Sequence, residues 1–364
     1  GQNAAQLSDK ALQERAKLLH NMGEDDEKRG DLTSAQRNFD EAARNTGLLL
    51  AKVPQDPQRI FDQAQSEYWV GFVAWRREDW AAARSHFEAY AKLADRLVQS
   101  DPTNDTWLME VSYAATNLGM VTLRQAGRPD EARRQFQKAL EIERGVAEHK
   151  PDDPKLQREI AKALAWIADA ERLGGDLHGA LAARREQRAI LAGLLAKTPN
   201  SLAIRKALLD QELAVARIEI AQGKFLEAEK RLDRGRAAGL ELARADPDNK
   251  DIPKETRMFE LFTVKAWLAE PANSRPPVRQ ITDRLGDCKA TEASLATEEI
   301  NDFCNVLLAR VREVAGDHIG ARIALSSVSP HSAAQRNVLT AHWGLNLSEE
   351  AGAMQLAAVG AKTR

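Results

Sequence analysis

The 364-residue sequence has little of what metal sites and membrane spans require. It contains 2 cysteines and 7 histidines, and no stretch of 18 or more apolar residues. A zinc site needs four closely spaced ligands, and no cluster of His or Cys supplies them, so we expect no bound metal. A membrane helix needs a long apolar run, and a cleavable signal pattern is also absent. We therefore expect neither direct membrane insertion nor an export signal in this chain.

Two further absences concern charge of one sign and catalytic motifs. Lys and Arg number 52 against 54 Asp and Glu, which gives a formal net charge of −2 and argues against a nucleic-acid partner. There is no P-loop, no GxSxG, no HExxH and no glycine-rich kinase loop. The acidic stretch 23–31 lacks the spacing of a calcium loop and is interpreted as a solvated face. The sequence predicts no enzyme activity and no cofactor.

The two cysteines leave two interpretations open. Cys288 and Cys304 are either separate buried thiols or a disulfide. If the chain reverses near 294–297, both lie about equally far from the turn and can face each other across a helical hairpin. A disulfide would imply an oxidising compartment.

What the chain does have is an internal repeat. Five prolines follow one another at steps of 48 or 49 residues: Pro54, Pro102, Pro151, Pro199 and Pro247. Five alanines keep the same steps: Ala35, Ala83, Ala132, Ala180 and Ala228. Aromatic residues are only 5% and Ala and Leu dominate the apolar set, which favours helices. Two markers in one rhythm indicate a repeated structural unit.

Each unit reads as two helices. In the unit 152–199, Asp153 is a natural N-cap and Pro154 a natural first helical residue, and apolar residues follow at helical spacing. Gly174 and Gly175 end that helix, and Asp176 caps the next one. A helix pair cannot bury its apolar faces alone, so we expect the units to stack on a continuous core.

Residues at fixed offsets from the marker alanine carry a family resemblance. A small residue occurs before it in each unit: Gly23, Gly71, Gly119, Ala168 and Ala216. Four residues after it come Phe39, Phe87, Phe136, Arg184 and Leu232, so the aromatic side chain is lost along the chain. This pattern resembles the tetratricopeptide (TPR) repeat, whose usual period is about 34 residues.

The resemblance implies an all-α, right-handed α-solenoid of TPR-like helix pairs. We expect about five regular 48-residue units and a TPR-like solenoid over residues 1–270, with a sixth first-type helix at 252–270. A break follows at 271–277. Residues 278–364 are expected to form degenerate helical hairpins that cap the array, including a helix-turn-helix junction at 314–325.

The segment 66–98 resembles long-period TPR arrays of bacterial multidomain receptors, which often follow a Ser/Thr kinase, winged-helix or TIR-type domain. The resemblance, with an opening that lacks an initiator Met, implies a sensor module of a larger signalling protein. We expect it to be periplasmic, with the cytoplasm as the alternative location. The alternative function is a passive assembly scaffold or adaptor, and a homodimer is compatible with either.

In TPR solenoids the first helix of each pair lines the concave groove, so the resemblance implies a protein, peptide or small-molecule ligand there. The expected groove residues are His20, Asn21, Tyr68, Trp69, Phe72, Trp75, Arg76, Thr116, Asn117, Met120, Arg124, Trp166, Asp169, Arg172 and Arg217. The aromatic residues 68–75 either pack between units or leave one or two rings exposed as anchors. The arginines at 76, 124 and 172 are either solvated or form a basic ladder.

Overall fold

The computed structural model describes residues 7–249, 251–288 and 298–328, and the regular structure in these ranges is entirely helical. The helices of the first half are α1 (Asp9–Lys28), α2 (Leu32–Lys52), α3 (Pro57–Arg76), α4 (Trp80–Ser100), α5 (Asp105–Ala126), α6 (Pro129–His149) and α7 (Pro154–Leu173). Those of the second half are α8 (Leu177–Lys197), α9 (Leu202–Ala221), α10 (Phe225–Ala245), α11 (Asp251–Ala269), α12 (Val278–Leu285), α13 (Glu298–Val314) and α14 (His318–Ser326). The all-α fold expected from the sequence is confirmed.

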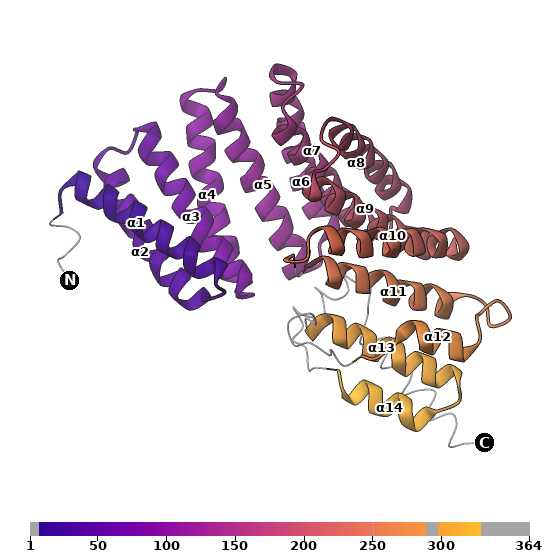
Figure 1. Ribbon diagram of the computed structural model, residues 1–364. Helices are drawn as coiled ribbons and strands as arrows, with labels where there is room; N and C mark the ends of the chain where they lie inside the picture. Colours follow the sequence, from indigo (N-terminus) through magenta and orange to yellow (C-terminus); the bar gives the residue numbers. More distant parts are fainter. Residues whose placement is uncertain (1–6, 250, 289–297, 329–364) are drawn as a thin grey trace. The chain divides into compact units, whose positions relative to one another are not determined.

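The helices follow one another in antiparallel pairs along the chain (Figure 1). The first helices of successive pairs begin at residues 9, 57, 105, 154, 202 and 251, which are steps of 48 or 49 residues. The chain divides into two compact units, Gly1–Ala163 and Leu164–Arg364, with the boundary inside α7. We call them unit 1 and unit 2. The stretch 271–277, where the sequence predicts a break, is the turn between α11 and α12 inside unit 2, and the predicted domain division stays a prediction.

The turns inside the pairs show why the second helices begin where they do. The carboxylate of Asp31, Asp79 or Asp176 accepts a hydrogen bond from the backbone N–H three residues later, at 3.0, 3.1 and 2.8 Å respectively. Such an N-cap satisfies one of the backbone donors that a helix start leaves unpaired. Just before the last of these caps, Gly175 adopts φ 89°, a left-handed conformation that glycine reaches without strain. Capping residues thus fix each turn locally.

The seam within each pair is built from the marker alanine and the residue four positions later. All five marker alanines are fully buried, and Phe39, Phe87 and Phe136 are at most 2% exposed. A Cβ added to Gly23 would lie 2.8 Å from the ring of Phe39, and one on Gly119 would lie 2.5 Å from that of Phe136. The small residues of the first helices therefore make room for the phenylalanines of the second helices.

The last described helices of unit 2 pack around Phe259, Phe262 and Phe303. Cys288 and Cys304 form a disulfide, with 5.3 Å between their Cα atoms, which joins the end of α12 to α13. The turn expected near 294–297 lies outside the described residues, as does the part of the expected capping region beyond residue 328. Within the described ranges, none of the helices is both long and apolar enough to span a membrane.

Candidate functional site

The expected groove residues all lie on first helices. In unit 1, α1 carries His20 and Asn21, α3 carries Tyr68, Trp69, Phe72, Trp75 and Arg76, and α5 carries Thr116, Asn117, Met120 and Arg124. In unit 2, α7 carries Trp166, Asp169 and Arg172, and α9 carries Arg217. Asn21 and Arg76 are exposed, and the others are half-buried. The residues form two separate groups, one in each unit.

The main group in unit 1 is a chain of four rings along α3, here called the aromatic row: Tyr68, Trp69, Phe72 and Trp75. The centroids of Tyr68 and Trp69 lie 5.3 Å apart, those of Trp69 and Phe72 5.7 Å, and those of Phe72 and Trp75 5.9 Å. Such distances allow favourable ring–ring contacts. All four side chains are half-buried, so the row is neither a closed core nor a free surface.

Second-helix and first-helix neighbours hold the row from both sides. Trp69 stacks on the buried ring of Phe39 at 5.1 Å and meets His20 edge-on at 5.4 Å. On the opposite side, the ring of Tyr68 lies 5.9 Å from that of buried Tyr90. Packing and partial exposure are thus combined in the same residues, because each ring has one face against a neighbouring helix.

Polar groups border the row at its Trp75 end. The guanidinium of Arg124 lies over the ring of Trp75, 5.0 Å from its centroid, a cation–π geometry. Arg76 forms an ion pair with Glu27 of α1. On α5, the half-buried amide of Asn117 makes no side-chain hydrogen bond to any described residue. The site therefore combines aromatic faces with a cation and an amide, a set that suits a peptide better than a purely apolar ligand.

Two buried carboxylates lie beneath this face on α5 and α6, and the sequence analysis missed both. Glu110 accepts hydrogen bonds from Tyr90 Oη at 2.5 Å and Gln65 Nε2 at 2.7 Å, and Glu143 accepts one from Ser112 Oγ at 2.7 Å. Burial raises the pKa of Glu110 and raises that of Glu143 to about 7. Their positions within apolar helical runs give the only sequence signal.

The second group, in unit 2, is a cluster of three arginines around one carboxylate, here called the arginine cluster. Asp169 lies 2.9 Å from Nη2 of Arg184 and 3.9 Å from Nε of Arg172. Arg217 is close enough to both to act electrostatically, and its guanidinium lies 5.6 Å from the ring centroid of Phe262. Arg184 occupies the register position of Phe39, so the break in the phenylalanine pattern was the signal that could have identified it.

The charges of the arginine cluster act on one another strongly. Burial alone would raise the pKa of Asp169, but Arg184, Arg172 and Arg217 together lower it to about 2. Burial, with the charges of the other arginines, lowers the pKa of Arg217. The carboxylate is therefore ionised at neutral pH, and it holds three cations that would otherwise repel one another.

The arginines at 76, 124 and 172 do not form an exposed ladder of equivalent cations. Arg76 pairs with Glu27, Arg124 covers Trp75, and the side chain of Arg172 is only 10% exposed beside Asp169. Their common register position thus serves a different contact in each pair. In the described part of the chain, no group of three or more His, Cys, Asp or Glu residues is placed to hold a metal ion.

No protein-family model and no curated protein matches this chain. Among solved structures, the chain is similar to RapI in its apo form, at 14% identity over 89% of this chain and 98% of that one, with a TM-score of 0.56. It is also similar to aspartyl phosphate phosphatase F from Bacillus subtilis, at 13% identity over 86% and 69% of the two chains and a TM-score of 0.55. A Rap protein complexed with competence and sporulation factor matches at 13% identity, 86% and 74% coverage and a TM-score of 0.50. Together with the helix pairs, these similarities confirm the TPR-like α-solenoid fold expected from the repeat.

Proposed function

We propose that this protein is a non-catalytic adaptor that binds a peptide or protein segment on the first-helix face of α3 and α5. The observation that carries the proposal is the aromatic row, whose rings are held by buried neighbours yet remain partly exposed. Rigid aromatic side chains that lose little freedom on binding are the usual energetic centres of protein interfaces.

Polar groups beside the row would orient the bound segment. Asn117 offers an amide donor and acceptor, and Arg124 offers a cation that is already positioned over Trp75. The similar Rap protein that was solved in complex with competence and sporulation factor shares this fold, and it supports a binding role without naming the ligand here. A passive scaffold would have no need of a partly exposed ring row of this kind.

A peptide-selection experiment tests the proposal. Peptides are selected from a random library on the full chain, and the affinity of the best one is measured by fluorescence polarisation. We expect the Trp75→Ala and Asn117→Ala double variant to bind it at least tenfold more weakly, since loss of an interface anchor typically costs 2 kcal/mol or more. If the folded double variant binds like the unmodified chain, the first-helix face is not the site.

Trp107→Ala is the matched control. Trp107 lies on the same helix, α5, and packs against the core around Tyr90 and Leu93, outside the aromatic row. It tests whether the loss of any half-buried tryptophan lowers the affinity through reduced stability. Peptide binding by this variant is expected to stay within about twofold of the unmodified chain, which is the scatter expected for a residue outside the site.

The narrower prediction, a periplasmic sensor module of a membrane Ser/Thr kinase or similar receptor, is also kept as a proposal. The disulfide Cys288–Cys304 favours it, because disulfides persist in oxidising compartments. Mass spectrometry of the protein isolated from its native cells with free thiols blocked on lysis gives the test. Recovery of both cysteines as free thiols would contradict the periplasmic location and leave the adaptor function untouched.

A further inference from the structure

Unit 2 contains a long groove that the sequence analysis did not find. It runs between the second helices α8 and α10, with the first helix α9 as its floor. One end has a volume of about 530 Å³ and is lined on α8 by Leu181, Arg185 and Arg188. The other end has a volume of about 610 Å³, and both ends share Glu212 and Arg234. We call the whole the α8–α10 groove.

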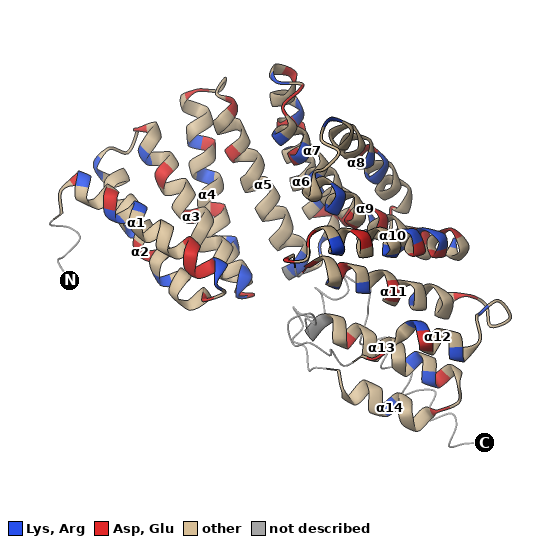
Figure 2. Ribbon diagram, viewed as in Figure 1, with Lys and Arg blue, Asp and Glu red and all other residues tan. Residues whose placement is uncertain are grey.

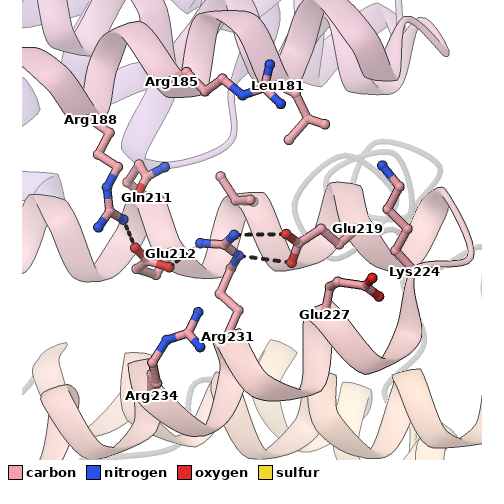
Figure 3. A pocket seen from close by; sticks show the side chains of 11 residues that line it. Leu181, Arg185, Arg188, Gln211, Glu212, Glu219, Lys224, Glu227, Arg231 and Arg234 are labelled. Carbon is pink, nitrogen blue, oxygen red and sulfur yellow. Dashed lines mark hydrogen bonds and ion pairs between the residues drawn. The ribbon is translucent and has the colours of Figure 1, made fainter.

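The first end of the groove is densely charged (Figure 3). Glu212 and Glu219 project from α9 and are both bound by Arg231 of α10. Arg231 contacts Glu219 through two nitrogens at 2.9 Å each, and Arg188 of α8 forms an ion pair with Glu212. These two carboxylates and two arginines neutralise one another and give the groove a fixed polar floor.

After these pairs, the same end keeps an excess of positive charge. Arg185, Lys224 and Arg234 also line it, are exposed and form no ion pair with any described residue. Glu227 is the one remaining carboxylate among the lining residues. Three cations against one anion give a net charge of about +2, and this excess would attract an acidic partner. Figure 2 shows the charged residues that follow α8 and α10.

The second end of the groove is mainly apolar. Leu195 of α8, Leu208 and Leu209 of α9, and Ala238 and Leu242 of α10 line it. Its charges, those of Arg205 and Glu241, balance each other once the shared residues are set aside. Apolar walls give no advantage to a phosphate backbone, so they favour a peptide over a nucleic acid.

We propose that the α8–α10 groove binds an acidic segment of a partner protein, with carboxylates over Arg185 and Arg234 and apolar side chains between Leu195 and Ala238. The floor extends from Arg205 to Glu219 along α9. At 1.5 Å per residue this length is about 21 Å, which accommodates about six residues of extended peptide. This site uses other helices than the aromatic row and is independent of the proposed function.

The test uses the full chain and the fluorescein-labelled, C-terminally amidated peptide EEDLAL, measured by fluorescence polarisation at low salt. We expect EEDLAL to bind at least tenfold more tightly than KKKLAL or EEDSGS, and its affinity to fall as salt is raised. The double variant Arg185→Glu and Arg234→Glu should lose at least tenfold in affinity. Both residues are exposed and unpaired, so the double variant is expected to fold.

Two further variants locate the effect. Lys230→Glu makes the same charge reversal on an exposed residue of α10 outside the groove and is expected to change binding less than threefold. Ala238→Trp fills the apolar end from an exposed position and should weaken binding at least fivefold. The Trp75→Ala and Asn117→Ala variant should bind EEDLAL unchanged, which separates this site from the first-helix face.

Three outcomes would overturn the proposal. One is the absence of EEDLAL binding up to millimolar peptide. Another is equal binding by the folded Arg185→Glu and Arg234→Glu variant, or equal binding of KKKLAL. The third is that polyuridylate displaces the peptide and itself depends on Arg185 and Arg234, which would assign the groove to a nucleic acid.

Discussion

The helix pairs of unit 1 and the α7–α8 pair solve the same packing problem differently. In unit 1 the register position is filled by phenylalanine, at most 2% exposed, against a glycine of the first helix. In the α7–α8 pair it is filled by Arg184, which is 4% exposed and bonded to Asp169. A buried cation with its counter-ion can therefore replace an aromatic side chain within one repeat.

The difference shows which property of the position the repeat requires. Phenylalanine stabilises through apolar burial, whereas a buried ion pair gains little net free energy because desolvation offsets the attraction. What both have in common is volume next to the marker alanine, which is fully buried in every pair. The position requires a filled space, and its polarity is free to vary if charges are paired.

The largest effect is expected for Phe136→Ala. Removing a fully buried phenylalanine leaves a cavity against Gly119, and such changes cost about 3–5 kcal/mol. Phe136→Leu should cost only about 1–2 kcal/mol, since Leu232 fills the equivalent position in the α9–α10 pair. Urea denaturation followed by circular dichroism measures both. Equal costs for the two substitutions would show that volume is not the requirement.

The next effect is expected for Asp169→Asn in the arginine cluster. The substitution leaves the buried cation of Arg184 without its carboxylate, and because Asp169 is partly exposed we expect a loss of about 2–3 kcal/mol. Hydrogen exchange of α8 amides reads the loss locally. Asp95→Asn, at an exposed and unpaired aspartate of α4, is the matched control and should change stability by less than about 0.5 kcal/mol.

Asp169 and Glu143 should also give opposite pH dependences. The pKa of Asp169 is about 2, so its contribution is present above the unfolded pKa and is lost as the pH falls toward 2. The pKa of Glu143 is raised from 4.5 to about 7, so the folded state binds the extra proton and stability falls as the pH rises between these values. Glu143→Gln should therefore stabilise the protein by about 2 kcal/mol at pH 8, and by almost nothing near pH 4. Urea denaturation at the two pH values checks this, and an equal effect at both would contradict it.

The smallest effect is expected for Gly23→Ala. The new Cβ would approach the ring of Phe39 to 2.8 Å, but alanine favours helix over glycine by up to about 1 kcal/mol, so the net cost should be about 1 kcal/mol. In a Phe39→Leu background the same substitution should become neutral or stabilising. A double-mutant cycle measures the coupling, and additive effects would mean that the glycine does not make room for the ring.

The fold could be predicted from the sequence because its signals are local and repeated. Proline and aspartate mark each helix start, and a buried alanine recurs in every pair, so an error in one unit is corrected by the others. The site was predicted less completely. The register placed Trp69 and Trp75 on a first helix, but the ring contacts that leave them half-exposed depend on Phe39 and Tyr90 of other helices.

The parts that could not be predicted depend on contacts between side chains far apart in the sequence. Glu110 is buried because Tyr90, 20 residues earlier, donates to it, and no local pattern predicts that pairing. The α8–α10 groove arises from spacing between three helices, which a linear pattern does not contain. Arg184 is the intermediate case, since its departure from the phenylalanine pattern is visible but its partner Asp169 is not.

The regular step between first helices also bears on how the length of such a chain can change in evolution. Each pair presents to the next a face built on the same register, and the steps between first helices are 48 or 49 residues. Duplication or loss of one segment of that length would join two compatible faces and leave the remaining pairs undisturbed. The number of pairs can therefore vary in whole steps, and a lineage can lengthen or shorten the chain without redesigning its core.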